Sequence, residues 1–246
     1  MQSFKEYLAE ATAGPGTFAP WHISDPEKVQ YFMSNYAKWS GWKVNKDGTV
    51  SVTKVDYTPL GVYGDIGGYG HGETALMVKY RNAKKFEIIM GDDANFKSLW
   101  GVPDICLYLG ISAHNLETLE HCTPTIKGSL YLYTPKLKRF DCGNVTIADE
   151  LKIGSIGQAP LSDLHKYFHM RIIRFFSGSL SELFRKPVLS LLKCNAQITW
   201  GTNMFPDPKI QEVMKVIQIL NQHNSNSILQ CQEDLIDAGY KDYAEL

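Results

Sequence analysis

The chain has 246 residues, with 25 Lys and Arg against 26 Asp and Glu, and a net charge of −1. This balance argues against a protein that holds nucleic acid or an anionic membrane by bulk charge. With 44% hydrophobic and 21% charged residues, the composition excludes a disordered chain. Aromatic residues reach 12%, including 13 tyrosines, which favours strands and contact surfaces over long helices.

The first residues have the pattern of an amphipathic helix. One apolar stripe recurs at the i, i+3, i+4, i+7 spacing of a helical face and consists of Phe4, Tyr7, Leu8 and Ala11. The Ala-Gly-Pro-Gly stretch at 13–16 ends the pattern. Residues 1–16 are therefore predicted to form a docking helix with a short linker.

Residues 17–83 are predicted to form an N-terminal cap made of a helix and a hairpin. The helix is expected over 24–42, where Pro26 suits the first helical position and apolar residues recur at helical spacing. Asp47-Gly48 between alternating residues indicates a hairpin turn. The glycine-rich stretch 61–72 lacks the context of a phosphate-binding loop and is expected to be a flexible connection.

Residues 84–205 contain a degenerate repeat. Each unit has a short alternating apolar strand followed by a pair of apolar residues in an L-x-x-L-like arrangement. The last apolar position of each unit is, in turn, Leu99, Leu119, Phe140, Leu164 and Leu183. A period of about 20–24 residues with one strand per unit is typical of leucine-rich repeats. The fold class predicted is α/β, a short solenoid of about five coils with a parallel sheet.

The C-terminal residues 206–246 are predicted to form a helical pair that caps the other end. Asp207-Pro208 begins the first helix, and Ile210, Val213 and Ile217 belong to its apolar stripe. A second helix is expected to run from Ile228 to Tyr243, with an interruption at Gly239. Caps are needed because a single repeat cannot bury its own face.

Two resemblances follow from these motifs. Asn95-Phe96-Lys97-Ser98-Leu99 and Asn115–Pro124, together with the Trp42–Val50 opening, resemble leucine-rich-repeat-like proteins of large tailed bacteriophages over roughly 42–200. The third to fifth units are degenerate, with Lys136 where the pattern has Asn. The resemblance implies a repeat solenoid that acts by binding rather than by catalysis.

The second resemblance concerns the first eleven residues alone. They are similar to the capsid-targeting peptide of internal head proteins of T-even-type phages. In that family a prohead protease cuts after a Leu/Ile-x-Glu tripeptide, which Leu8-Ala9-Glu10 matches. The resemblance implies cleavage between Glu10 and Ala11, and docking through Phe4, Tyr7 and Leu8.

No catalytic or metal site is predicted, and no cofactor is expected. Five widely spaced cysteines without a CxxC motif indicate small buried apolar residues in a reducing compartment rather than disulfides. His165 and His169 would share a helical face and could hold zinc, but the sequence places no third ligand. The same holds for His114, His121 and Cys122, while Asp65, His71 and Glu73 match no acid–base motif.

The tyrosines of the repeat strands are the predicted binding residues. Tyr108, Tyr131 and Tyr133 alternate with leucines, so one set points inward and the other outward. An outward set would form a contact surface, whereas an alternative is that the tyrosines pack under a helix. A basic cluster, Lys79, Arg81, Lys84 and Lys85, is expected to be a solvated face.

The function predicted is therefore non-catalytic protein binding by a virion-associated phage protein. The partner would be a phage virion protein or a host protein, with no nucleic acid and no membrane involved. Two alternatives remain: a structural subunit of the head, neck or tail, and a host-directed effector or enzyme delivered with the phage DNA. The expected location is the virion or the host cytoplasm.

Overall fold

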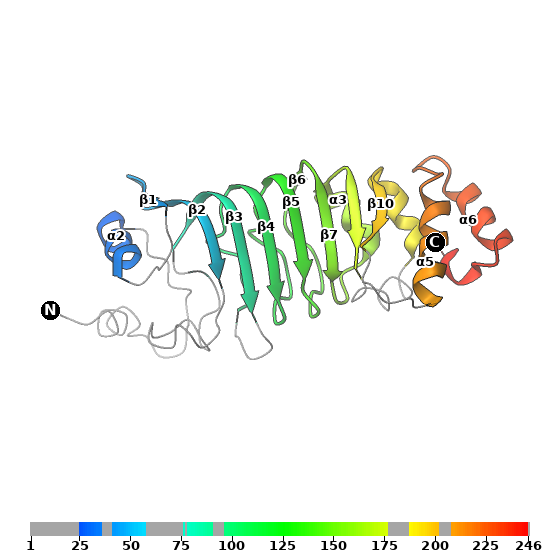
Figure 1. Cartoon of the computed structure of the whole chain (residues 1–246), viewed down its shortest axis with the longest axis horizontal. Coiled ribbons are helices and arrows are strands. Elements are labelled where there is room, and N and C mark those ends of the chain that lie inside the picture. The colour runs from blue at the N-terminus through cyan, green and yellow to red at the C-terminus, as the bar shows by residue number, and fades with distance from the viewer. Residues whose placement is uncertain are drawn as a thin grey trace.

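The structure is a computed structural model, and it describes residues 25–35, 41–57, 76, 78–90, 96–176, 187–201 and 208–245. The chain forms an α/β fold with one mostly parallel sheet and several helices. In Figure 1 the strands stand side by side across the middle of an elongated molecule, with helix α2 at one end and helices α5 and α6 at the other. None of the described helices is both long and apolar enough to cross a membrane.

The predicted hairpin is confirmed at the first edge of the sheet. β1 (Trp42–Val44) pairs antiparallel with β2 (Val50–Tyr57), and Trp42 lies opposite Val52. Gly48 adopts a φ of 77° in the turn, where Asp47 accepts a hydrogen bond from the Thr49 amide at 3.1 Å. A positive φ suits glycine because glycine carries no Cβ.

All later strand pairs are parallel. The main path through the sheet is β1-β2-β3-β4-β5-β7-β9-β10, and its parallel members after β2 are β3 (Tyr80–Met90), β4 (Ile105–Ala113), β5 (Thr125–Tyr133), β7 (Glu150–Ser155), β9 (Ile172–Phe175) and β10 (Gln197–Trp200). Two short strands lie off this path: β6 (Val145–Ile147), which pairs with β5, and β8 (Phe168–His169), which pairs with β6. From β1 to β5, strands that follow one another in the chain are therefore neighbours in the sheet, whereas β6 and β8 lie beside the main path.

The register aligns apolar residues into columns that point into the core. One column consists of Phe86, Leu109, Leu130, Leu151, Ile173 and Ile198, and the next along the strands consists of Ile88, Ile111, Leu132, Ile153 and Phe175. Every one of these side chains is buried. Since a slip of one residue would turn a column outward, burial fixes the register.

Strands β3, β4 and β5 share one break in the inward–outward alternation, here called the bend, which the alternation in the sequence does not predict. In β3 two consecutive residues, Lys84 and Lys85, lie between the buried Ala83 and Phe86. At the corresponding place the register between β4 and β5 shifts: Leu107 alone lies between Cys106 and Tyr108, whereas Lys127 and Gly128 both lie between their partners Ile126 and Ser129. Such a bulge places an extra residue on the outer face and increases the local twist.

The segments that return the chain fill the space behind the sheet. Leu99, Leu119, Phe140 and Leu164, the predicted closing positions of the repeat, are all buried, while Leu183 lies outside the described residues. The described residues of these segments include the short helices η1 (Leu161–Asp163), α3 (Leu164–Tyr167) and η3 (Val188–Cys194). Backbone bonds also join successive returns, as from the Leu119 amide to the Phe140 carbonyl at 2.9 Å.

Helices occupy both ends. α2 (Pro26–Asn35) lies within the predicted helix, and its Val29, Phe32 and Met33 are buried. At the other end are α5 (Pro208–Leu220) and α6 (Ile228–Asp237). The expectation that the second helix reaches Tyr243 is wrong: α6 ends at Asp237, since Gly239 takes a φ of 86°, and Tyr243 belongs to a separate turn, η4 (Lys241–Tyr243).

The last strand is completed by a side chain. Asn221, just after α5, accepts a hydrogen bond from the Ile198 amide at 2.8 Å and donates one to the Ile198 carbonyl at 2.7 Å. Both backbone groups of Ile198 that face away from β9 are thereby satisfied. Edge strands otherwise offer such groups to other chains.

Gly157 and Gly143 form a matched pair for testing how tightly the returns pack. Both have positive φ, 53° and 65°. A Cβ on Gly157 would lie 2.5 Å from the Pro135 carbonyl oxygen, whereas one on Gly143 would meet nothing within 4 Å. We expect Gly143→Ala to cost about 1 kcal/mol, the strain of the left-handed conformation, and Gly157→Ala to cost clearly more. Urea unfolding measures both, and equal losses would contradict the tight packing.

Candidate functional site

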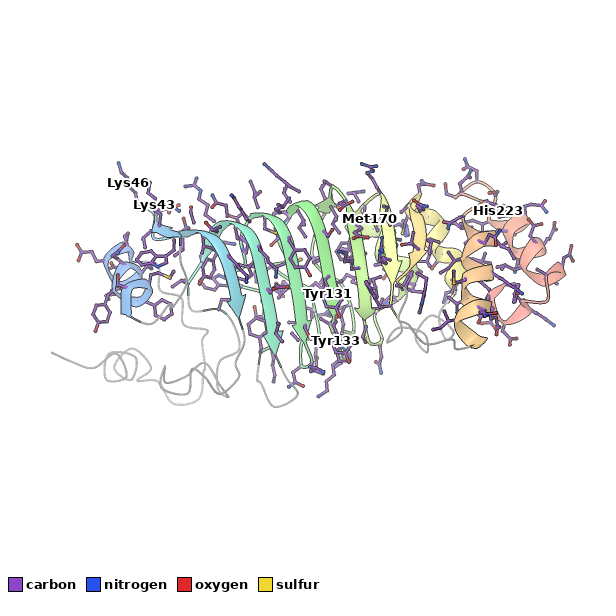
Figure 2. The ribbon with its side chains drawn as sticks, in the orientation of Figure 1. Lys43, Lys46, Tyr131, Tyr133, Met170 and His223 are labelled. Atoms are coloured by element: carbon purple, nitrogen blue, oxygen red, sulfur yellow. The ribbon has the colours of Figure 1, made fainter. Side chains whose placement is uncertain are left out.

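The three predicted tyrosines lie on the outer face of the sheet. Tyr108 is in register with Lys85, and Tyr131 is in register with Lys152. Tyr133 is two residues further along β5, and Figure 2 shows it nearer the ends of the strands than Tyr131. No described helix lies across this face in Figure 1. Of the two predicted arrangements, the outward one is therefore present.

The tyrosines do not stand away from the sheet but lie over neighbouring glycines. A Cβ on Gly154 would be 2.8 Å from the Tyr131 Oη and 3.1 Å from the Tyr133 Cδ2. A Cβ on Gly110 would be 3.2 Å from the Tyr108 Cε1. Glycine therefore leaves the space that each ring occupies. All three tyrosines are half-buried as a result.

Further rings hold this aromatic layer together. The Tyr131 and Phe176 rings meet edge to face with centroids 6.3 Å apart. The His114 and Tyr133 rings do the same at 5.3 Å. Edge-to-face contacts at such distances favour fixed ring positions. The layer presents rings whose orientation is set before any partner arrives.

Charged side chains surround Tyr108. The Nζ atoms of Lys85 and Lys152 lie 5.7 Å and 5.9 Å from the centre of its ring, within range of a cation–π interaction. Lys85 also forms an ion pair with Glu87. We call Tyr108, Tyr131, Tyr133, Lys85 and Lys152 the tyrosine surface.

Glu150 is the central anion beside this surface. Its two carboxylate oxygens each accept a hydrogen bond at 2.8 Å, one from Lys152 and one from Arg174, and its side chain is only 13% exposed. Burial is the largest single influence and opposes ionisation, but the charges and hydrogen bonds of Lys152 and Arg174 together outweigh it, so the pKa of Glu150 is lowered. Burial also raises the pKa of Tyr108 and of Tyr131.

The predicted docking and cleavage peptide does not belong to the described part of the chain. Phe4, Tyr7, Leu8, Glu10 and Ala11 lie outside the described residues. The same holds for the glycine-rich stretch 61–72 and for its neighbour Glu73. The structure therefore bears on the predicted sheet surface and not on the predicted peptide.

The histidine and cysteine sites considered from the sequence do not assemble. Among the described residues no group of three His, Cys, Asp or Glu could hold a metal ion. His165 belongs to α3, which ends at Tyr167, whereas His169 belongs to β8, so the two do not share a helical face. All five cysteines are free thiols.

Burial makes the thiols poor nucleophiles. It raises the pKa of Cys106, Cys142 and Cys194 to about 12 and that of Cys231 to about 11. For Cys122, burial raises the pKa well above its ordinary value. Since the thiolate is the reactive form, these side chains act as small apolar core residues.

The bend exposes a second group of residues that the sequence did not single out as a surface. At this place Leu107 of β4 is 53% exposed, and Ile105 is 43% exposed two residues earlier. The flanking strands contribute Lys84 and Lys127, both exposed. Alternation alone assigns Leu107 and Leu109 to one side, whereas the extra residue at the bend separates them.

No model of a known protein family matches this chain, and no curated protein or solved structure shows significant similarity to it.

Glu150→Gln tests whether the ion pairs fix the outer face. At neutral pH we expect a loss of about 1 kcal/mol in the free energy of unfolding, because a neutral amide replaces a paired carboxylate. The folded pKa of Glu150 lies below its ordinary value of 4.5, so this contribution is complete above that pH and disappears as the pH falls through the folded pKa. Urea unfolding from pH 7 to pH 3 measures it.

Glu117→Gln is the matched control for that experiment, since Glu117 pairs with Lys138 at 2.8 Å on the exposed return side. Its loss should be smaller than that of Glu150→Gln. A difference between wild type and Glu150→Gln that stays constant down to pH 3 would contradict the assigned role of the two cations.

Proposed function

We propose that this chain is a non-catalytic protein that binds another protein through the tyrosine surface of its sheet. The observation that carries the proposal is the layer of three outward tyrosines held over glycines and between paired charges. Tyrosine supplies a large amphipathic contact with little loss of side-chain entropy, and it is enriched among residues that dominate binding energy. A surface ordered in advance reduces the cost of association.

The solenoid interpretation supports the same function. From β2 to β5, successive strands pair in parallel, and the predicted closing residues Leu99, Leu119 and Phe140 are buried in successive returns. We take this arrangement as support for a leucine-rich-repeat-like solenoid, the class that the repeat period suggests. Repeat architectures of this kind present extended faces, which suits binding of a protein rather than of a small molecule.

The phage assignment rests on sequence resemblance. The first eleven residues resemble capsid-targeting peptides, and the Asn115–Pro124 motif resembles phage repeat proteins. We propose that the protein is virion-associated, that its N-terminal segment docks through Phe4, Tyr7 and Leu8, and that the tyrosine surface meets a virion or host protein.

Site-specific photo-crosslinking tests the binding surface. A benzophenone amino acid placed at Tyr131 or Tyr133 should give adducts with one and the same foreign protein in cells that produce the chain. The same probe at Glu117 or Lys138, on the exposed return side, serves as control and should give none. With the captured partner, Tyr131→Ala should weaken binding at least about 10-fold, as for a residue that dominates an interface. Equal adducts from both sides, or none from the sheet, would contradict the proposal.

Intact-mass spectrometry of purified virions tests the phage assignment. A chain that begins at Ala11 is expected, because cleavage after Glu10 would accompany passage through the prohead. A full-length chain in virions would favour a structural subunit over a targeted internal protein. Absence of the protein from virions would contradict virion association while leaving the binding surface open to the crosslinking test.

A further inference from the structure

The outer ridge formed by the bends carries cations that have no ion-pair partner among the described residues. We call it the bend row, and it consists of Lys84, Leu107, Lys127, Ala148 and Arg171, all exposed. The register places Leu107 between Lys84 and Lys127, because Ala83, Cys106 and Ile126 are aligned one residue earlier. Within the described part of the chain, its three cations form no ion pair or side-chain hydrogen bond.

Among the described residues, the neighbouring carboxylates form no ion pair with this row. Asp149 accepts a hydrogen bond from Ser129 at 3.3 Å, and Glu150 is held by Lys152 and Arg174. Several other cations near the sheet have carboxylate partners, as Lys79 has in Asp104 at 2.8 Å. The bend row thus combines unpaired positive charge with the exposed side chains of Leu107 and, one step earlier on β4, Ile105. The predicted solvated cluster is therefore not uniform: Lys79 and Lys85 form ion pairs, whereas Lys84 has no ion-pair partner in the part of the chain that the structure describes.

Helix α6 presents the opposite combination. Leu229, Glu233, Ile236 and Asp237 fall at i, i+4, i+7 and i+8, which is one face of a helix. Leu229 is 68% exposed and Ile236 is 46% exposed. Glu233 and Asp237 are exposed and, among the described residues, have no ion-pair or side-chain hydrogen-bond partner. This face is opposite to the one that buries Cys231 and Leu235.

The two surfaces have matching dimensions. Strands lie about 4.8 Å apart, so the backbones that carry Lys84 and Lys127 are roughly 10 Å apart with that of Leu107 midway between them. A helix rises 1.5 Å per residue, so along α6 Ile236 lies about 4.5 Å and Asp237 about 6 Å beyond Glu233. With Ile236 placed over Leu107, Glu233 lies beside one flanking lysine, and Asp237 lies within reach of the long side chain of the other.

The helix that fits the bend row cannot come from the same molecule. α6 lies beyond β10, with α5 packed against that strand, as Figure 1 shows. Leu107 is on β4, four strand spacings or about 19 Å from β10. We infer that the bend row binds the exposed face of α6 from a second copy of this chain, so that copies associate head to tail.

Such a contact joins two different surfaces, so a bound pair of copies still offers one free bend row and one free α6 face. Heterologous contacts of this type close into a ring or continue as an open chain of copies. The contact uses the bend row and not Tyr131 or Tyr133, so it is independent of the proposed binding of a foreign protein. Failure of either hypothesis leaves the other standing.

Charge reversal on the full-length chain tests the inference. Sedimentation velocity at low salt should show a mass that rises with protein concentration and falls in about 1 M salt, where charges are screened within about 3 Å. Lys84→Glu with Lys127→Glu should weaken association at least about 10-fold, and so should Glu233→Lys with Asp237→Lys, because like charges then meet. Lys193→Glu with Lys215→Glu changes the net charge equally at other exposed positions and should leave association unchanged.

The decisive measurement is the mixture of the two reversed variants. Each alone should remain monomeric, whereas the mixture should associate again, since the reversed bend row of one faces the reversed α6 of the other. Circular dichroism and thermal unfolding of each variant establish that it is folded. A wild-type chain that stays monomeric at every concentration at low salt would overturn the inference. Association that is unchanged in the charge-reversed variants would overturn it as well. So would a mixture of the two variants that fails to associate.

Discussion

The parallel backbone ladder between consecutive strands is the constraint on which the rest of this structure depends. Its register fixes which side chains become neighbours from strand to strand. Inside, it aligns Phe86, Leu109 and Leu130 into one buried column, and a slip of a single residue would expose it. Outside, the same register places Lys85 beside Tyr108 and Tyr131 beside Lys152. Core and surface are therefore two products of one alignment.

On the outer face this alignment separates two kinds of charge. Near the tyrosines, anions such as Glu150 lie among cations and are held by short hydrogen bonds. Along the bends, Lys84 and Lys127 lie beside an exposed leucine and meet no carboxylate within the described part of the chain. Paired charges make the first surface rigid and nearly neutral, while unpaired charges give the second an electrostatic preference. One sheet thereby offers two surfaces of different chemistry.

The inward half of the sheet could be predicted from the sequence, because alternation and the recurrence of Leu99, Leu119 and Phe140 reflect burial directly. The bend could not, because an extra outward residue breaks the alternation without any distinctive residue type. β6 and β8 were missed as strands since they are only three and two residues long and their pairing comes entirely from distant neighbours. Short strands of this kind carry almost no local signal.

The outward direction of Tyr108 and Tyr131 could be predicted from the two-residue alternation of side chains along a strand. The placement of their rings over neighbouring glycines could not. The ring positions depend on Gly110 and Gly154, which have no Cβ. At Gly154, rings from the neighbouring strand occupy the space that a Cβ would take. The sequence separates Gly154 from Tyr131 by more than twenty positions, so only the register reveals the relation. The unpaired state of the bend-row cations is likewise a property of the assembled sheet.

The amide of Asn221 has a consequence for how long such a sheet can become. The Asn221 amide bonds both backbone groups of Ile198, as one residue of a further strand would. It offers no backbone groups to which another strand could pair. The end of the sheet is thus encoded by a single side chain on the closing helical segment rather than by the strands. A duplicated strand-and-return unit inserted ahead of β10 would leave this terminator untouched. A sheet lengthened by such a duplication could therefore still end at the same Asn221 side chain.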